Sequence, residues 1–191
     1  MRYLFYYRPN WKLFYRKFTE WVFHEFFHKT GKLLDIGCGE GYYLKEFKKL
    51  GFKTCGCDIE AINGVDKVNI ETDVLPYNSD MFDYVFCKSV IEHLEHFDLL
   101  LTEIHRVLKK DGILFIQTWD WKRNQKNFWD DFTHKKPFTK FSLKSMLECY
   151  DFDVLIIKHM THFPFIWRWS WRFFNMNFPF RHEMYAVCRK N

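Results

Sequence analysis

The sequence has no long hydrophobic run. Every apolar stretch of the 191-residue chain is interrupted by charge well before the roughly 18 residues that a membrane-spanning helix needs. The N-terminus also lacks an uninterrupted apolar stretch followed by small residues, the pattern of a secretory signal peptide. We therefore expect neither a spanning helix nor a signal peptide. The expected location is cytoplasmic, with membrane association left open.

Metal-type cysteine spacing is also missing. The six cysteines include no Cys-x-x-Cys pair and no zinc-type arrangement. We interpret them as buried, reduced thiols of a cytosolic protein, and we expect no metal site. The length fits one domain that is large enough to bury a continuous core, so no second catalytic domain is expected.

A glycine-rich turn is the most informative feature that is present. The apolar run that begins at Leu33 breaks into Gly37, Gly39 and Gly41, and a helical pattern follows. This order predicts a strand, a tight turn and the first turn of a helix. Glycine allows a positive φ and lets a ligand approach where a Cβ would collide. The turn is typical of nucleotide binding, but it has neither the Gly-Lys-Ser/Thr ending nor the glycine spacing of the two phosphate-binding motifs.

Strand and helix patterns alternate along the rest of the chain. After the strand that begins at Leu33, we expect strands at 53–57, 65–70, 82–87, 113–118, 153–158 and 183–189. Helices are expected at 11–27, 42–50, 97–110 and 141–149.

The stretch from Leu33 to Gly41 resembles motif I of the class I S-adenosylmethionine-dependent methyltransferases. The usual form of that motif is an acidic residue, an aliphatic residue and then Gly-Cys-Gly-x-Gly, and the resemblance extends in good order to Thr118. It implies a three-layer α/β, Rossmann-like fold whose seven-stranded sheet is mostly parallel with an antiparallel last strand. Residues 1–191 would form a single methyltransferase domain with an N-terminal amphipathic cap at 1–31 and an aromatic insert at 159–182. The implied cofactor is S-adenosyl-L-methionine.

Two acids are expected to hold the adenosyl part of this cofactor. Asp58 follows the second strand, where a doubly wound fold presents an acid to ribose hydroxyls; a surface turn acid is the alternative. The resemblance implies that Asp73 faces the adenine amino group and that Val74 packs on the ring, although Asp73 also suits a turn before Pro76. The complete cofactor-binding set that we expect is Asp35, Gly37, Cys38, Gly39, Gly41, Tyr43, Asp58, Ile59, Asp73, Val74, Lys88 and Ser89.

The segment after the fourth strand restricts the acceptor. It begins with Lys88 and Ser89, which are expected to border the methionine part of the cofactor. Amino-directed nucleobase methyltransferases carry Asp or Asn, two prolines and an aromatic residue here, and cytosine carbon methylation uses a Pro-Cys dipeptide that this chain lacks. Nucleic acid is therefore an unlikely partner. For His93, a hydrogen-bonded helix residue is favoured over a base.

The long polar and aromatic segment 119–139 contains the expected catalytic residues. Its part from Asp131 to Phe138 resembles an Asp-x-Thr-His-x-x-Pro segment found in a subset of class I enzymes, several of which act on glycans or lipid-linked saccharides. His134 is the first candidate for a general base, because an imidazole with an ordinary pKa near 6.5 suits that task. Asp131 would orient the imidazole or act as the base itself. The alternative is that His134 only pins the loop.

Basic and aromatic residues gather at the two ends of the chain. The formal charge is +5 over residues 1–32, −7 over 33–100 and +5 over 158–191. The amphipathic helix at 11–27 is expected to lie against the sheet, and contact with a membrane surface or an amphipathic substrate is the alternative. The insert at 159–182 is expected near the rim of the active site, either as a lid or as a lipid or sugar contact surface.

The function favoured by these observations is methyl transfer to a hydroxyl of a saccharide or lipid-linked saccharide. One alternative acceptor is a prenylated or lipid small molecule at a membrane surface, and a second alternative is a non-catalytic adaptor with the same fold. The expected partner is a small-molecule or glycan acceptor, with peripheral membrane contact through the aromatic basic ends. The sequence does not determine the oligomeric state.

Overall fold

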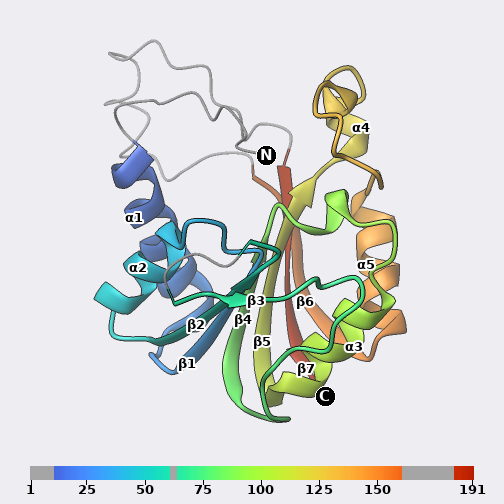
Figure 1. Ribbon diagram of the computed structural model, residues 1–191. Helices are drawn as coiled ribbons and strands as arrows, with labels where there is room; N and C mark the ends of the chain where they lie inside the picture. Colours follow the sequence, from blue (N-terminus) through green and yellow to red (C-terminus); the bar gives the residue numbers. More distant parts are fainter. Residues whose placement is uncertain (1–10, 61–63, 161–182) are drawn as a thin grey trace.

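A seven-stranded sheet forms the centre of the protein (Figure 1). The computed structural model describes residues 11–60, 64–160 and 183–191. The strand order is β3-β2-β1-β4-β5-β7-β6; the first five strands run parallel, and β7 runs antiparallel to both of its neighbours. This confirms the predicted fold class. The strands are β1 (Lys32–Ile36), β2 (Lys53–Asp58), β3 (Asp66–Lys67), β4 (Phe82–Lys88), β5 (Leu108–Trp119), β6 (Phe152–His159) and β7 (Glu183–Lys190).

Helices cover both faces of the sheet. Figure 1 shows α1 and α2 on one side and α3 and α5 on the other. The segment that follows β5 carries the short helix α4 near one end of the sheet. The helices are α1 (Trp11–Val22), which continues as the π-helical turn η1 (Phe23–Phe27), α2 (Tyr42–Lys49), α3 (Asp98–Val107), α4 (Trp121–Asn124) and α5 (Lys140–Cys149).

Two sequence-based boundaries are wrong. The helix expected at 97–110 ends at Val107, because fully buried Leu108 already pairs with Phe82 at the start of β5. The pairing then shifts, so that Ile113 lies opposite Tyr84. Residue Asp111 inside this bulge has a φ of +61°, which no α-helix accommodates. The strand expected at 65–70 has only two paired residues.

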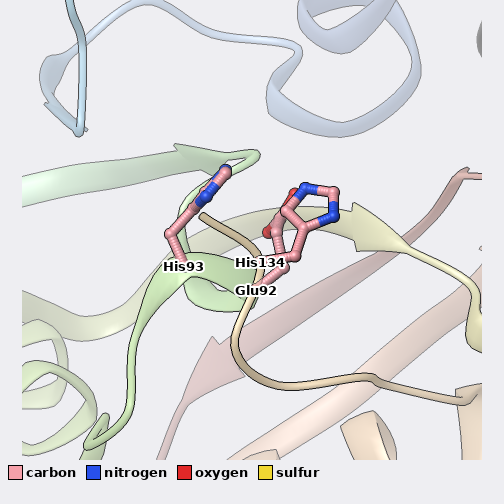
Figure 2. A group of neighbouring side chains, drawn as sticks. All are labelled: Glu92, His93 and His134. Atoms are coloured by element: carbon pink, nitrogen blue, oxygen red, sulfur yellow. The ribbon is translucent and has the colours of Figure 1, made fainter. Parts of the chain in front are cut away.

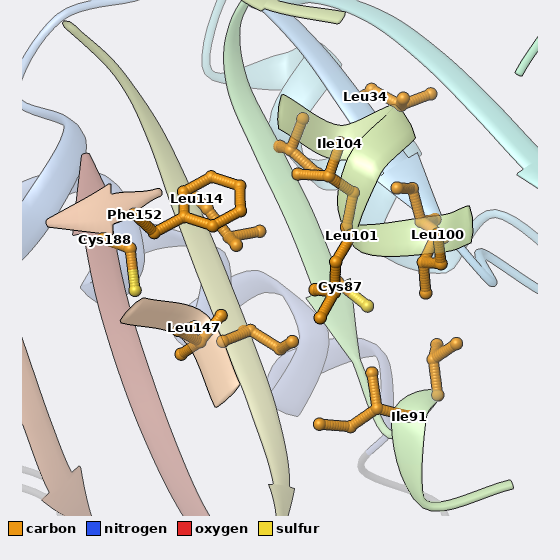
Figure 3. Packing of buried hydrophobic residues seen from close by; sticks show 14 of the residues in the cluster. Leu34, Cys87, Ile91, Leu100, Leu101, Ile104, Leu114, Leu147, Phe152 and Cys188 are labelled. Carbon is orange, nitrogen blue, oxygen red and sulfur yellow. The ribbon is translucent and has the colours of Figure 1, made fainter. Parts of the chain in front are cut away.

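The core has two chemically different layers because successive strand residues point to opposite faces. Mostly aliphatic side chains, with Phe82, Phe138 and Phe152 among them, pack under α3 and α5 (Figure 3). Aromatic side chains fill the opposite layer, under α1 and α2. Phe115 belongs to the aromatic layer, whereas its neighbours Leu114 and Ile116 belong to the aliphatic one.

The N-terminal helix packs its apolar face onto this aromatic layer. Phe14, Phe18 and Val22 are buried, and the ring of Phe18 lies 6.2 Å from Phe86 and 6.1 Å from Phe115, centroid to centroid. The expectation that this helix lies against the sheet is confirmed. None of the described helices has the length and apolar character needed to cross a bilayer. Residues 1–10 and the insert from 161 to 182, including the choice between a lid and a contact surface, lie outside the described residues.

Candidate active site

The glycine turn connects β1 to α2. Gly37, Gly39 and Gly41 all have positive φ values, of +67°, +51° and +71°. A Cβ on Gly37 would lie 2.4 Å from Cγ2 of Val90, whereas a Cβ on Gly39 would have no heavy atom within 4 Å. Glycine at 37 is therefore required for packing. Glycine at 39 instead leaves the backbone open to a ligand.

Asp58 lies directly at this turn. At the end of β2, its Oδ2 accepts a hydrogen bond of 2.8 Å from the backbone nitrogen of Gly39, and its Oδ1 accepts one of 3.1 Å from that of Glu60. Each carboxylate oxygen has two lone pairs, so both oxygens can accept a further hydrogen bond. The structure thus brings together the glycine turn and the acid that was expected to bind a ribose.

Asp35, Lys88 and Ser89 come from the ends of the two central strands. Asp35 is buried, and its Oδ2 has no hydrogen-bond partner among the described residues. Burial, and then the neighbouring Asp58, raise the pKa of Asp35 well above its usual range, although Lys88 opposes the shift. Lys88 Nζ donates to Ser89 Oγ over 3.1 Å. Ser89 has a φ of +55°, a strained conformation of the kind that clusters at functional sites.

The remaining predicted cofactor residues lie in two different surroundings. Cys38 and Tyr43 face the interior: Cys38 is buried, and the ring of Tyr43 lies 5.2 Å from that of Phe86. Ile59 and Val74 are largely exposed apolar side chains. The adenine contact predicted for Val74 stays a prediction.

Asp73 is used locally in its own turn. Its Oδ2 accepts from the backbone nitrogen of Asn69 and its Oδ1 from the hydroxyl of Thr72, both over 2.9 Å. These hydrogen bonds, that from Asn69 first, lower the pKa of Asp73. The turn role that the sequence left open is therefore present, and the adenine contact of Asp73 stays a prediction.

His134 and Asp131 lie close together in the segment after β5. His134 is buried; its Nδ1 lies 2.6 Å from the carbonyl oxygen of Phe128, and its Nε2 lies 3.9 Å from Oδ2 of Asp131. The hydrogen bond to Phe128 joins two residues of the same loop, so the alternative that His134 pins the loop to the domain stays a prediction. The second ring nitrogen is 3.9 Å from Asp131, beyond hydrogen-bond distance, so orientation of the imidazole by this acid stays a prediction. Burial opposes ionisation of Asp131, but hydrogen bonds from Thr133 lower its pKa overall.

Glu92 and His93 join this pair, a grouping that the sequence pattern did not predict (Figure 2). Glu92 is fully buried, its Oε2 accepts from the hydroxyl of Thr118 over 2.8 Å, and its Oε1 has no partner among the described residues. Burial raises the pKa of Glu92 to about 7. His93 belongs to the short 3-10 helix η2 (Ile91–His93) and lies 2.9 Å from Oγ1 of Thr133, which confirms the expected hydrogen-bonded helix residue.

Further polar groups end at the same edge of the sheet. Because β7 is antiparallel, its first residue, Glu183, lies beside the ends of β4 and β5; Gln117 donates a hydrogen bond to it, and Lys88 Nζ lies 3.9 Å away. Asp120 also accepts a hydrogen bond from His159 at the end of β6. Polar residues at the ends of expected strands were the available signal for these groups.

Residues 9–156 match the family model described as a methyltransferase domain. The chain belongs to this methyltransferase family. A ubiquinone biosynthesis O-methyltransferase of Pelagibacter ubique is 31% identical over 102 residues, which are 47% of this chain and 42% of that protein. An (S)-coclaurine N-methyltransferase of Papaver somniferum is 32% identical over 100 residues, which are 44% of this chain and 28% of that protein. The chain thus spans less than half the length of these curated relatives.

Solved structures show that the fold is that of the class I methyltransferases. A SAM-dependent methyltransferase from Archaeoglobus fulgidus superimposes with a TM-score of 0.68 at 21% identity, covering 92% of this chain and 94% of that one. The [4+2]-cyclase SpnF superimposes with a TM-score of 0.65 at 18% identity, covering 92% of this chain and 80% of that one. The second protein is named for a different reaction, so the fold alone does not fix the chemistry.

The cofactor implied by this methyltransferase family is S-adenosyl-L-methionine, and the described residues fit it. The open backbone at Gly39 suits a nucleoside, and Asp58 retains lone pairs for ribose hydroxyls. The buried, unpartnered Oδ2 of Asp35 suits the ammonium group of the methionine part. When bound, this cofactor supplies a methyl group that is already activated on a sulfonium.

Proposed function

We propose that the chain transfers the methyl group of S-adenosyl-L-methionine to a hydroxyl oxygen of a prenylated or other lipid small molecule. Transfer to oxygen is favoured by the names of several relatives, which are ubiquinone biosynthesis O-methyltransferases. Because the matched stretch covers less than half of those proteins, their acceptor does not pass directly to this chain. The acceptor class therefore needs support from the site itself.

The observation that carries this acceptor class is the pair of exposed aromatic rings around Asp131. Trp129 and Phe132 are 52% and 75% exposed, although large aromatic side chains are usually mostly buried. They lie in the same segment as Asp131 and His134. An apolar tail could cover these rings while a polar head group reaches the buried histidine.

The chain's own residues have three tasks in such a reaction. They hold the acceptor oxygen close to the methyl carbon, they exclude water, and they accept the hydroxyl proton. His134 is suited to the third task, because its Nδ1 is held by Phe128 and its Nε2 faces Asp131. A positioned base of this kind typically contributes on the order of 10²- to 10⁴-fold to the rate.

A saccharide or lipid-linked saccharide remains the second candidate acceptor. The observation that favours it is the segment from Asp131 to Phe138, which resembles that of enzymes acting on glycans. The names of the relatives described above contain no saccharide. Both candidates require the same hydroxyl chemistry, so the identity of the labelled product decides between them.

The test is transfer of a labelled methyl group from the cofactor to fractionated cell extract. If the acceptor is a lipid small molecule, the label should appear in the apolar fraction of the organic-solvent extract. A labelled glycan that mild acid releases would instead contradict this acceptor and support the saccharide candidate. The variant His134→Ala should reduce incorporation at least a hundredfold while leaving the affinity for S-adenosylhomocysteine nearly unchanged. Label in neither fraction, together with no affinity for S-adenosylhomocysteine, would favour the non-catalytic adaptor.

A further inference from the structure

We propose that Glu92, His93 and His134 form a binding site for one divalent cation of the zinc class. The three side chains come from two segments, one after β4 and one after β5, and lie next to one another (Figure 2). Each offers one ligand atom, and the three atoms lie within 4.8 Å of one another. Around an ion with ligands at about 2.1 Å, neighbouring ligand atoms are roughly 3–4 Å apart, so closure by about one ångström completes the set.

Both histidines have one ring nitrogen occupied, which leaves the other available for an ion. Nδ1 of His134 faces the carbonyl oxygen of Phe128, which can only accept, so this nitrogen carries the proton. Nδ1 of His93 faces Oγ1 of Thr133, and the Thr133 hydroxyl donates its own proton to Asp131. Nδ1 of His93 is therefore also the donor. In both rings the lone pair remains on Nε2.

This arrangement is the one that metal-binding histidines use. Such histidines donate their second ring N–H to a carbonyl oxygen, a carboxylate or water, which fixes the ring and its tautomer. Here Phe128 provides a carbonyl oxygen for His134, and the hydroxyl of Thr133 connects His93 to the carboxylate of Asp131. These partners orient both Nε2 atoms before any ion binds.

One oxygen of the buried Glu92 carboxylate has no partner among the described residues, and a cation would supply one. Its Oε2 is engaged by Thr118, but Oε1 is shielded from solvent and has no partner among the described residues. An unpartnered buried oxygen of an acid costs folding free energy, and nearly all such atoms in proteins have a partner. A cation between Oε1 and the two imidazoles would satisfy it.

Backbone contacts hold the two ligand-bearing segments together. The carbonyl oxygen of Glu92 accepts hydrogen bonds of 2.8 Å and 3.1 Å from the backbone nitrogens of Lys135 and Lys136. Nζ of Lys136 also donates to the carbonyl oxygen of Glu95 over 3.0 Å. The site is therefore built on fixed backbone, as affinity for an ion requires.

Two imidazoles and one carboxylate favour zinc or a similar transition ion over magnesium or calcium, which prefer all-oxygen ligands. Three protein ligands leave a coordination position open, as in catalytic zinc sites. An acceptor hydroxyl at that position would lose its proton more readily, because the ion lowers its pKa, and the proton would pass to the carboxylate of Asp131, whose Oδ2 lies 3.9 Å from Nε2 of His134. This role rests on the proposed O-methyl transfer, and in it His134 is a ligand rather than a base; ion binding itself does not depend on that function.

The test is metal titration of the full chain without cofactor or acceptor. Chelator-treated protein is titrated with Zn²⁺ by calorimetry and with Co²⁺ by visible absorption, which reports the coordinating atoms. We expect one ion per chain, and at least a tenfold loss of affinity in Glu92→Gln, in His93→Ala and in His134→Ala. Thr133→Val removes only the group that orients His93, and it should weaken binding by about 10- to 100-fold.

The matched control is His96→Ala, which removes an exposed histidine of the same segment and should bind the ion as the parent does. Affinity for S-adenosylhomocysteine is measured on every preparation, so a variant that retains it is folded. No bound ion in the parent protein, or equal binding by the parent, Thr133→Val and His93→Ala, would overturn the proposal. A chain that binds the ion but methylates no acceptor would contradict the proposed function alone.

Discussion

The carboxylate of Asp58 and the backbone nitrogen of Gly39 are joined by a hydrogen bond of 2.8 Å. This bond connects the end of β2 to the turn after β1, so the acid and the open backbone form one surface. Any ligand that contacts Gly39 from the open side meets a carboxylate with unused lone pairs. Substitutions of Asp58 or Gly39 should therefore change the affinity for the cofactor more directly than any other property.

Replacing Asp58 by Ala should weaken binding of S-adenosylhomocysteine by about 1–3 kcal/mol, because hydrogen bonds to a charged acceptor are lost. Asp58→Asn keeps one acceptor oxygen and should lose less. The control is Asp153→Asn, which removes an exposed ion pair with Arg189. Calorimetric titration measures all three, and an Asp58→Ala protein with the parent's affinity would remove this residue from the cofactor site.

Two alanine substitutions in the glycine turn should have different effects. Both Gly37→Ala and Gly39→Ala pay roughly 1–2 kcal/mol for a positive φ. Only Gly37→Ala also forces a methyl group into Val90, so its free energy of unfolding should fall further. Gly39→Ala should mainly reduce affinity for S-adenosylhomocysteine, because its methyl group occupies the ligand side. Urea denaturation and calorimetry separate the two effects; equal stability losses would contradict the packing role of Gly37.

The stability of the protein in acid should depend on Glu103. Its two oxygens accept hydrogen bonds from Arg106, and Oε2 also accepts one of 2.7 Å from the backbone nitrogen of Leu75. The bond to Arg106, more than any other contact, lowers the pKa of Glu103 below its ordinary value of 4.5. The unfolded chain therefore takes up this proton first, and the stabilisation is present above the unfolded pKa and lost as pH falls through the folded one.

Glu103→Gln should consequently cost about 1–3 kcal/mol of unfolding free energy near neutral pH and less below the folded pKa. Urea denaturation at a series of pH values between neutrality and pH 3 measures the difference. Glu148→Gln is the control, because its exposed ion pair with Lys144 should contribute little at any pH. A constant difference across the series would show that Glu103 does not titrate as described.

Truncating the N-terminal helix at its buried face should destabilise the whole domain. Phe18 is fully buried and contacts the rings of Phe86 and Phe115, so Phe18→Ala should cost about 3–5 kcal/mol. Leu13→Ala, on the same helix but 45% exposed, should cost much less. Denaturation midpoints compare the two, and similar values would mean that the helix contributes little to the fold.

Local patterns predicted most of the fold. Periodicity or turn residues within the segment itself were enough to predict the glycine turn, the buried strand β4 and the helix α5. The start of β5 was missed because Leu108 continues the apolar pattern of α3, and only pairing with distant Phe82 ends that helix. The two-residue β3 was overestimated for the same reason: its length depends on β2 and not on its own residues.

The sequence predicted a site residue only where the nearby sequence itself indicates what that residue does. Asp58 has a characteristic distance from the glycine turn, whereas the burial of Glu92 depends on Thr118 and the segment around His134. The Glu92-His93 dipeptide reveals nothing about His134, which lies 41 positions after His93 in the chain. Asp73 shows the converse, since its own turn supplied two hydrogen-bond donors that a family resemblance does not report.

The aromatic docking of α1 also constrains how the protein is made. Trp21 contacts Phe115 in β5 and Tyr185 in β7. Because α1 precedes both strands in the chain, it leaves the ribosome before its partners have been synthesised. At typical synthesis rates the nascent helix waits roughly ten to thirty seconds with its apolar face uncovered. During that interval its uncovered apolar face is accessible to chaperones, and β7 later completes the surface onto which the helix packs.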